Sequence, residues 1–374
     1  MPSDPPNPAP ITYADTGVDY DRLDAFKVAC QQAAATTVGE LDRHGLAEAA
    51  GTRGESGYLM ERADGSYLAH VEEGLGTKNL IADAVGHATG DWSHYEAIGI
   101  DTIATAVNDL VTTGALPYSF AAHVGVGDAA WFDVEERAQA LARGFAAGCR
   151  MSGCVWGGGE TPALAGIIEP GAAVLAGSVV GGMAAGRRVA GDVQAGDRIV
   201  FLASNGVQTN GLSLCRKIGE RIGFDADIGD GTAFGPALLA PSRIYADFVR
   251  ELTARDLTAR YLVHVTGHGW RKLMRLEADL GYVINTPHHP GTVPPLFEFL
   301  MAAGPIERAE AYATFNMGVG FAAYVRPADA EATVAAAAAC GHDAWLAGEV
   351  VAGPKRVEVP SLDLRFDADS LSVR

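Results

Sequence analysis

The sequence lacks an apolar run that approaches the roughly 20 residues needed by a membrane-spanning helix. The segment Met1 to Pro10 is polar and rich in proline, and it lacks the apolar stretch of a signal peptide. Cysteine is scarce: the 5 residues are an odd number without a C-x-x-C pair, which disfavours both a disulfide framework and a zinc knuckle. We therefore expect a cytoplasmic protein that has no membrane partner and whose cysteines are reduced.

Positive charge is scarce as well. The chain has 28 Lys and Arg against 46 Asp and Glu, which gives a net charge of −18. A nucleic-acid backbone is bound mainly through clustered Lys and Arg, so we expect no nucleic-acid partner. Apolar residues make up 48% of the 374 residues and charged residues 20%, which is enough for a folded core. At roughly 100 to 200 residues per domain, this length predicts two domains, which we interpret as α/β units.

Hydrophobic periodicity predicts both strands and helices in the first half of the chain. A hairpin is predicted over residues 57–73, with its turn at Asp64-Gly65. Apolar residues at helical spacing predict one helix that runs on from Thr102 and another that follows Asp133. Further strands are predicted over residues 118–126, 172–180 and 198–203.

The stretch 181–196 is rich in glycine and alanine, and we interpret it as a domain boundary. The predicted domains are therefore residues 1–183 and residues 184–374. Beyond the boundary, helix and strand patterns alternate again. The predicted helices span residues 237–254 and 327–339, and the predicted strands span residues 261–265, 281–285 and 318–325.

The segment Glu72 to Lys78 follows a predicted strand and combines two carboxylates, two glycines, a hydroxyl and a lysine. That combination suits a phosphate bound together with magnesium. Glycines let backbone N–H groups approach phosphate oxygens, a carboxylate holds the hard cation, and lysine supplies positive charge. The spacing is not that of a Walker A loop. A hairpin end with a solvated charge cluster is the alternative interpretation.

A second motif, Gly99-Ile100-Asp101 followed by Asn108-Asp109, lies along the predicted helix. Asp101 and Asn108 share one stripe of that helix, while Asp109 lies roughly 80° around from Asp101. Taken alone, the motif is better explained by an N-cap aspartate and a solvated polar pair.

A third motif, Gly157 to Pro162, reads as a glycine-rich turn that ends in the carboxylate of Glu160. Consecutive glycines cost chain entropy, which favours a close approach of the backbone to another group. A plain loop is the alternative interpretation.

Taken together, the motifs resemble those of the phosphoribosylformylglycinamidine cyclo-ligase family, also called aminoimidazole ribonucleotide synthetases. Each motif is weak alone, but seven in the same order span nearly the whole chain. They are Tyr13 to Asp19, Gly74 to Lys78, Gly99 to Leu110, Gly158 to Thr161, Thr209 to Leu214, His264 to Gly267 and Thr314 to Gly320.

The resemblance implies an α/β (α+β) fold with an N-terminal sheet domain, through which the protein forms a homodimer, and a C-terminal α/β domain. It also implies an ATP site in the cleft near the dimer interface and a small phosphorylated substrate. ATP would activate a formyl-amide oxygen of formylglycinamidine ribonucleotide. A neighbouring nitrogen would then close the imidazole ring of aminoimidazole ribonucleotide with loss of phosphate. Such phosphoryl chemistry depends mainly on positioning and charge neutralisation, which accounts for the magnesium and the carboxylates.

By position, the resemblance assigns roles to individual residues. Catalysis would involve Lys78, His264 and Asp109. Magnesium would be held by Glu73, Asp109 and Glu160. The nucleotide would contact Glu73, Gly74, Gly76, Thr77, Lys78, Asp101, Asn108, Asp109 and Glu160. The substrate would contact Thr161, Gln208, Asn210, Gly211, His264, Arg271 and Lys272. For His264, proton transfer and substrate orientation are both open, and a satisfied core histidine is the ordinary alternative.

The sequence departs from the family pattern at four places. Glu73 stands where the family usually has aspartate. Gln208 replaces a histidine, and glutamine can form hydrogen bonds but cannot exchange a proton near neutral pH. The segment 268–275 is basic where the family has an acidic residue, and residues 51–57 replace a loop rich in glycine and phenylalanine.

These departures leave two functions open, because a shared fold does not fix the substrate. The first is a divergent cyclo-ligase in which Arg271 and Lys272 grip the ribose phosphate through charge-assisted hydrogen bonds. The second is a paralogue that uses the same ATP scaffold on another small phosphorylated substrate, as thiamine-monophosphate kinase does. A non-catalytic nucleotide-binding regulator is the third possibility, and the retained Lys78, Asp109 and Glu160 disfavour it.

Overall fold

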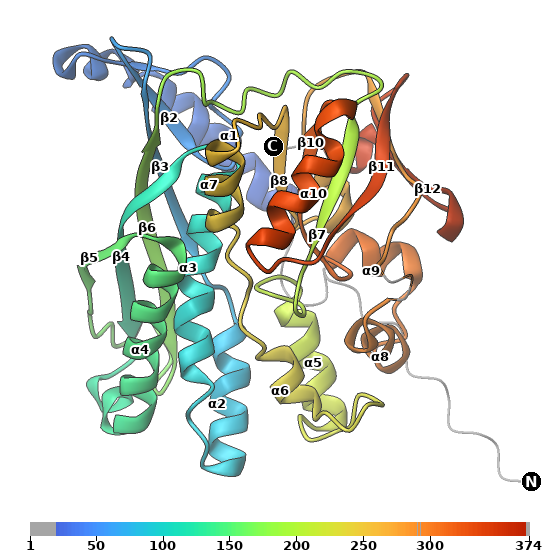
Figure 1. The fold of residues 1–374 in the computed structure, drawn as a ribbon. Coiled ribbons are helices and arrows are strands. Elements are labelled where there is room, and N and C mark those ends of the chain that lie inside the picture. The colour runs from blue at the N-terminus through green and yellow to red at the C-terminus, as the bar shows by residue number, and fades with distance from the viewer. Residues whose placement is uncertain (1–19, 290, 292, 372–374) are drawn as a thin grey trace, which may run out of the picture.

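The computed structural model describes residues 20–289, 291 and 293–371, with side chains from residue 25 onward. The segment Met1 to Pro10 and the motif Tyr13 to Asp19 lie outside the described residues. The described chain contains two sheets, each with its own helices, and they lie side by side in Figure 1.

The first half of the chain forms a six-stranded sheet in the order β1-β2-β3-β6-β4-β5. Its strands are β1 (Leu46–Glu48), β2 (Tyr58–Arg62), β3 (Tyr67–Gly74), β4 (Leu116–Val126), β5 (Val155–Glu160) and β6 (Ala173–Met183). Neighbouring strands are antiparallel except β4 and β5, which are parallel. The predicted hairpin is confirmed: β2 pairs with β3, and in the turn Asp64 Oδ1 accepts the backbone N–H of Ser66 at 2.9 Å.

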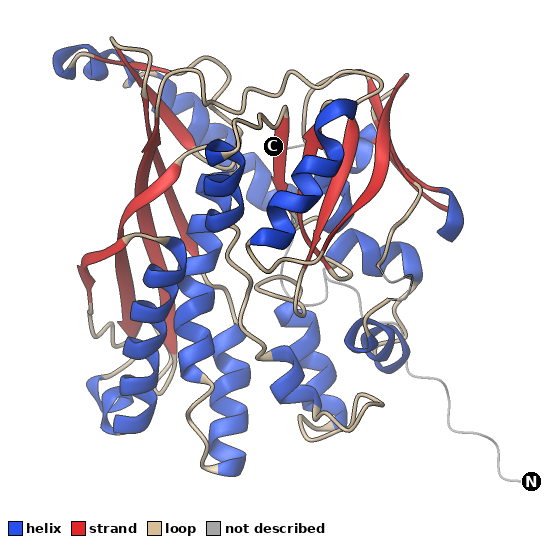
Figure 2. Cartoon of the chain, in the orientation of Figure 1, coloured by secondary structure: helices blue, strands red, loops and turns tan. Residues whose placement is uncertain are grey.

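Helices α2 (Lys78–Thr89), α3 (Tyr95–Val111) and α4 (Glu135–Ser152) lie on one face of this sheet (Figure 2). The helix predicted from Thr102 begins earlier, at Tyr95, because Tyr95 is itself part of the buried stripe. The helix predicted after Asp133 is confirmed as α4. Helices α3 and α4 approach closely, since a Cβ on Gly144 would lie 2.2 Å from the carbonyl oxygen of Glu96.

The turn predicted at Gly157 to Pro162 is wrong, because most of this segment forms strand β5. This strand pairs in parallel with β4, with Glu160 opposite His123. A Cβ on Gly159 would lie 2.0 Å from the carbonyl oxygen of Ala122, so glycine lets the two backbones come together. The close backbone approach expected of these glycines is therefore confirmed, within a sheet.

The second half forms a seven-stranded sheet in the order β13-β12-β9-β11-β7-β10-β8. Its strands are β7 (Arg198–Ala203), β8 (Tyr261–His264), β9 (Leu280–Ile284), β10 (Val319–Val325), β11 (Ala344–Ala352), β12 (Arg356–Val359) and β13 (Leu364–Asp367). Helix α10 (Ala330–Ala339) packs on β7 and β11 beside α7 (Ala246–Ala254). All strands predicted from the sequence are confirmed to within three residues at either end.

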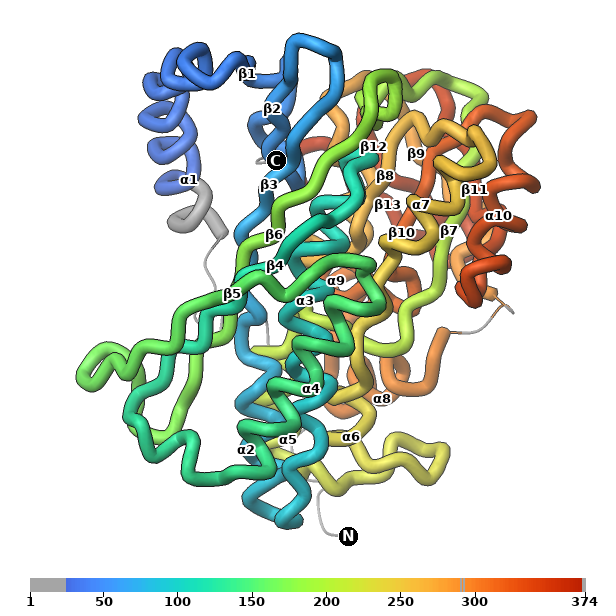
Figure 3. Tube along the Cα trace, turned by 60° about the vertical axis from the view of Figure 1, so that its left-hand side comes forward, coloured from blue at the N-terminus to red at the C-terminus, as the bar shows by residue number. Residues whose placement is uncertain are grey.

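The remaining helices used below are α1 (Tyr20–Ala35), α5 (Leu212–Ile222), α6 (Phe234–Leu238), α8 (Pro295–Ala303), α9 (Arg308–Thr314) and the short 3-10 helix η4 (Gly269–Met274). Figure 3 shows α1 and α10 on opposite sides of the molecule. Within the described part of the chain, no helix has the length and apolar character that crossing a membrane requires.

The single helix predicted over residues 237–254 is wrong. The segment contains the end of α6 and all of α7, separated by an irregular stretch that includes Pro241. Proline has no backbone N–H, and the N–H groups of Ser242 and Tyr245 donate to side chains of α3 rather than to carbonyls of their own helix. Long-range contacts therefore override the local helix pattern.

We propose the division into domains 1–183 and 184–374. Every described strand up to Met183 belongs to the first sheet, and every described strand from Arg198 onward belongs to the second.

Candidate functional site

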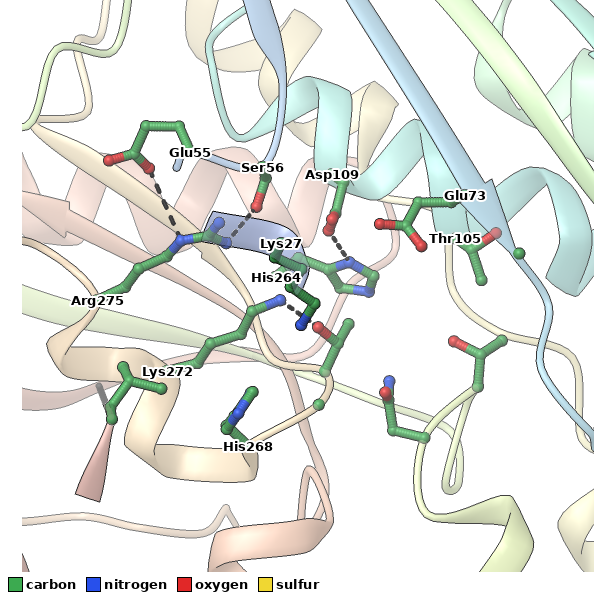
Figure 4. Close-up of a pocket in the computed structure, with 16 residues that line it drawn as sticks. Lys27, Glu55, Ser56, Glu73, Thr105, Asp109, His264, His268, Lys272 and Arg275 are labelled. Carbon is green, nitrogen blue, oxygen red and sulfur yellow. Dashed lines mark hydrogen bonds and ion pairs between the residues drawn. The ribbon is translucent and has the colours of Figure 1, made fainter. Parts of the chain in front are cut away.

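A cavity of about 350 Å³ lies between the two halves of the molecule. The residues that line it are drawn in Figure 4. The first half contributes the end of β3, the last turns of α3 and the loop before β2, and Lys27 comes from α1. The second half contributes the loop before α5, the end of β8 and helix η4. The acidic residues that line the cavity come from the first half, and the basic ones come from the second half except Lys27.

Glu73 and Asp109 form the acidic side, and both were predicted. Glu73 lies at the end of β3, and burial and the negative charge of Asp109 raise its pKa to about 7. Burial alone would also raise the pKa of Asp109, but the Lys272 cation and the hydrogen bond with His264 lower it. Asp109 is therefore the ionised carboxylate of the pair, while Glu73 exchanges its proton near pH 7.

His264 contacts Asp109 through its ring, with 2.7 Å between Nδ1 and the Asp109 Oδ1 atom. Burial lowers the pKa of His264 and the Asp109 contact opposes that shift, so the net direction is downward. A neutral imidazole that donates from Nδ1 to the ionised Asp109 has Nε2 as an acceptor. The pair thus resembles an oriented acid–base group, which is one of the two roles left open for His264.

Lys272 and Arg275 form the basic side, on and just after η4. Lys272 Nζ donates to Thr266 Oγ1, and burial lowers the pKa of Lys272 despite the opposing charge of Asp109. Arg275 donates to the side chain of Ser56 at 2.7 Å and to the carbonyl of Gly54 at 2.7 Å. Lys272 was predicted from sequence, whereas Arg275 was not assigned a role. The sequence feature that indicates a role for Arg275 is its i+3 spacing from Lys272, which puts both side chains on one side of a 3-10 helix.

The two segments in which the sequence departs most from the family pattern contact each other at this cavity. Residues 51–57 provide Ser56 and Gly54, and residues 268–275 provide the Arg275 guanidinium that binds them. The two divergent segments are therefore in direct contact, although more than 200 residues separate them in sequence.

Lys78 does not line the cavity. Its side chain is fully buried, and Nζ lies 2.6 Å from Asp101 Oδ2 and 2.8 Å from the carbonyl oxygen of Ala240. Asp101 Oδ1 also accepts the backbone N–H of Ser242 at 2.7 Å. Burial raises the pKa of Asp101, and the Lys78 cation opposes that shift. This geometry does not support the predicted contacts of Lys78 and Asp101 with a nucleotide, because each already binds the other half of the protein.

Asn108 has the same kind of partner. Its side-chain Oδ1 accepts the backbone N–H of Tyr245 at 2.9 Å, and its Nδ2 donates to the carbonyl of Arg243 at 2.8 Å. Three buried side chains, Lys78, Asp101 and Asn108, thus fasten α2 and α3 to residues 240–245.

Among the other residues predicted to contact the nucleotide, Gly74 lines the cavity. Thr77 and Gly76 lie beyond it, in the turn before α2. There Gly76 has a φ of +78°, and the Thr77 hydroxyl lies 3.3 Å from the Ser213 hydroxyl. Glu160 is exposed on β5 beside a separate shallow hollow, so the structure does not bring it to Glu73 and Asp109.

The residues predicted to contact the substrate are also divided. Asn210 lines the cavity together with Thr209, which was quoted in the motif but given no role. Gly211 precedes α5 with a φ of +73°, and Thr161 lies beside Glu160 at the hollow. Gln208 is buried with a φ of +56° and donates to the Tyr245 hydroxyl at 3.1 Å.

Arg271 also points elsewhere. Its guanidinium donates to the carbonyls of Ala313 at 3.0 Å and Ser370 at 3.2 Å, and it is not among the residues that line the cavity. Of the predicted cationic pair, the structure brings only Lys272 to the site.

This fold, with a charged cavity between two α/β halves, defines a two-domain protein of the AIR synthase-related class. The model "AIR synthase related protein, N-terminal domain" matches residues 54–183, and "AIR synthase related protein, C-terminal domain" matches residues 194–359. Within that class, the identity to curated relatives shows that the chain belongs to the phosphoribosylformylglycinamidine cyclo-ligase family. The resemblance identified from its motifs is therefore confirmed.

Two curated relatives illustrate the match. The phosphoribosylformylglycinamidine cyclo-ligase of Sorangium cellulosum is 37% identical over 355 residues, covering 91% of this chain and 95% of the relative. That of Burkholderia vietnamiensis is 33% identical over 355 residues, covering 92% and 96%. Among solved structures, AaThiL complexed with AMPPCP and TMP has a TM-score of 0.59 at 14% identity, covering 85% of this chain and 91% of that one. The structural likeness confirms the predicted fold.

Proposed function

We propose that the protein is an ATP-dependent phosphoribosylformylglycinamidine cyclo-ligase, which closes the imidazole ring of aminoimidazole ribonucleotide in purine biosynthesis. Membership of the family supports this activity. The observation that carries it is the cavity in which Glu73 and Asp109 of the first half face His264 and Lys272 of the second. A reaction that transfers a phosphoryl group and then closes a ring needs acidic, basic and proton-exchanging groups around one space.

Glu73 and Asp109 would hold Mg²⁺ at the nucleotide phosphates. Two carboxylates fit that ion, because Mg²⁺ usually keeps several waters and takes its remaining ligands from one or two carboxylates and the phosphates. Within the described residues, no three His, Cys, Asp or Glu side chains converge as a metal site, so the protein alone does not build a full cage. The ion would neutralise the charge of the nucleotide phosphates, and Lys272, on the opposite wall, would bind the phosphate of the substrate. Glu160 remains a proposed ligand on sequence grounds alone.

His264 would accept the proton that the ring-closing nitrogen loses. Its Nε2 is the acceptor, while Asp109 holds the ring through Nδ1 at 2.7 Å. Asp109 would therefore orient His264 and contribute to the cation site at the same time. Thr209 and Asn210, which line the same cavity, would contact the substrate.

The test is to incubate the full-length protein with ATP, Mg²⁺ and formylglycinamidine ribonucleotide, and to follow aminoimidazole ribonucleotide and ADP by chromatography. We expect both products in equal amounts, and no aminoimidazole ribonucleotide with the His264→Ala variant. A Cys340→Ser variant, altered away from the cavity, serves as the matched control and should keep full activity.

A second candidate is a paralogue that acts on a different phosphorylated substrate, and one observation favours it. The two divergent segments meet at the cavity through Arg275, where they would contact a substrate. ATP turnover with thiamine monophosphate, but not with formylglycinamidine ribonucleotide, would replace the cyclo-ligase proposal with this one.

We also propose a homodimer that forms through the open face of the first sheet. Tyr118 on β4 and Val174 and Val180 on β6 are 55%, 50% and 42% exposed there, on the side opposite α2, α3 and α4. The described side chains of α1 are also exposed, including Phe26 at 71%. A second copy of the chain would cover this apolar surface, since two-fold dimers are the commonest soluble assembly.

A further inference from the structure

Helix α4 ends in a motif that places two cysteines side by side. The backbone N–H of Gly153 binds the carbonyl of Arg150 at 3.1 Å, and the N–H of Cys154 binds the carbonyl of Cys149 at 3.0 Å. Gly153 has a φ of +73°. These two bonds and the left-handed glycine make a Schellman motif, in which the side chains at the ends of the longer bond meet. Here both side chains are thiols.

The two thiols contact each other as free cysteines. Neither residue is in a disulfide, and the 3.0 Å backbone bond between them holds both residues at the end of α4. Cys149 is 3% exposed, whereas Cys154 is partly exposed. The neighbouring Cys149 side chain lowers the pKa of Cys154, and the Cys154 side chain in turn raises the pKa of Cys149. Cys154, the more exposed thiol, is thus the one with the larger fraction of thiolate, which is the reactive form, and Cys149 is its buried neighbour.

We propose that Cys149 and Cys154 form a reversible disulfide, which makes the junction of α4 and β5 a modification site that responds to peroxide. The Cys154 thiolate attacks one oxygen of hydrogen peroxide, the O–O bond breaks, and sulfenic acid and water form. The Cys149 thiol then attacks the sulfenic sulfur, and its proton leaves with the hydroxyl as a second water. Two thiols lose two electrons and two protons in total, and the peroxide is reduced to two waters.

The site is separate from the cavity and from the proposed dimer surface. Trp156, two residues after Cys154, stacks edge-on against Phe145 of α4 with 5.3 Å between ring centroids. Side chains two apart on an extended strand point to the same face, so Cys154 lies on the helix-covered side of the sheet. The apolar face that we assign to the dimer is the opposite one.

Peptide mapping of the full-length protein tests the proposal. After treatment with hydrogen peroxide and alkylation, trypsin cuts after Arg143, Arg150 and Arg187. We expect the peptides 144–150 and 151–187 to appear joined, with a mass two hydrogens below their sum, and to separate after reduction with dithiothreitol. Within the same molecule, Cys154 should lose its free thiol at least about tenfold faster than Cys340, whose pKa is raised by burial.

Variants identify the role of each thiol. Cys154→Ser should abolish the joined peptide, and Cys149→Ser should let Cys154 stop as a sulfenic acid that dimedone traps. The matched control Cys215→Ser changes another buried cysteine and should keep the link. A Cys154 that is recovered as sulfinic or sulfonic acid in unlinked peptides of the parent protein, or that stays reduced while Cys340 reacts, would overturn the proposal. The parent protein alone gives this result, so it does not depend on the folding of any variant.

Discussion

Glu72 and Glu73 are adjacent on β3 but face different surroundings. Glu72 is exposed, whereas Glu73 lines the cavity beside Asp109. Since the folded-state pKa of Glu73 is raised to about 7 from an ordinary value of 4.5, folding favours its protonated form. The contribution of this carboxyl to stability is therefore complete below its ordinary pKa and is lost as the pH rises through about 7.

The same titration predicts how magnesium binding depends on pH. Mg²⁺ needs the ionised carboxylate, so the apparent affinity should rise by up to about tenfold per pH unit below the pKa and level off above it. Glu73→Gln should weaken binding at pH 8 by at least about tenfold and flatten the pH dependence. Isothermal titration with Mg²⁺ and a non-hydrolysable ATP analogue measures both effects. Glu72→Gln is the matched control, and an equal loss in that variant would contradict the assignment.

Lys272 and Arg271 are neighbours in η4 with different targets. Lys272 lines the cavity, while Arg271 donates to backbone carbonyls. A charge-assisted contact is worth about 1.5 to 3 kcal/mol, so Lys272→Met should raise the KM of the phosphorylated substrate more than tenfold. Steady-state kinetics with each substrate varied in turn measures this. Arg271→Met should keep its KM within about twofold of the parent, and the reverse pattern would restore the prediction that Arg271 grips the phosphate.

At the scale of elements, the buried Lys78–Asp101 pair joins α2 and α3 to the segment before α7. Asp101→Asn would leave a buried lysine without its counter-charge, which should cost about 3 to 5 kcal/mol of the free energy of unfolding. Urea denaturation followed by circular dichroism measures the loss. Replacement of both partners, Lys78→Met with Asp101→Leu, should recover only part of it, because the Ser242 N–H and the Ala240 carbonyl then lose their partners. If this double variant folds but has lost ATP turnover, Lys78 contacts the nucleotide after all, as its motif predicts.

The elements that were predicted correctly from the sequence are those whose formation depends on residues close together in the chain. The hairpin at Asp64-Gly65 and helix α4 depend on turn chemistry and on spacing between near neighbours. The break between α6 and α7 falls at Pro241, a local signal that the apolar spacing outweighed, and it is held by the bond from Ser242 to Asp101, a partner 141 residues away. In the same way, nothing in the segment Glu72 to Lys78 indicates that the Lys78 side chain is buried against the carbonyl of Ala240. Several motif residues line the cavity, but the direction of each side chain depended on tertiary contacts.

At the scale of the whole molecule, the open sheet face predicts the assembly. Val174→Asp together with Val180→Asp places charge in the middle of the proposed interface, where desolvation without a partner is costly. We expect the parent to sediment as a dimer at micromolar concentration and the double variant as a monomer. Leu346→Asp is the control, because Leu346 is 41% exposed on the second sheet instead. A parent protein that sediments as a monomer would remove the dimer proposal.

The fastening of residues 240–245 by Lys78, Asp101 and Asn108 also bears on how substrates enter and products leave. A hinge between the two halves would have to break several buried hydrogen bonds at once, and each leaves polar atoms without partners. Turnover should therefore proceed without a swing of one half against the other, and ligands should pass through the mouth of the cavity. Solution scattering profiles recorded with and without ATP and Mg²⁺ should therefore superimpose. The two halves would stay fixed relative to each other, and the residues around the opening of the cavity would control which ligands enter and leave.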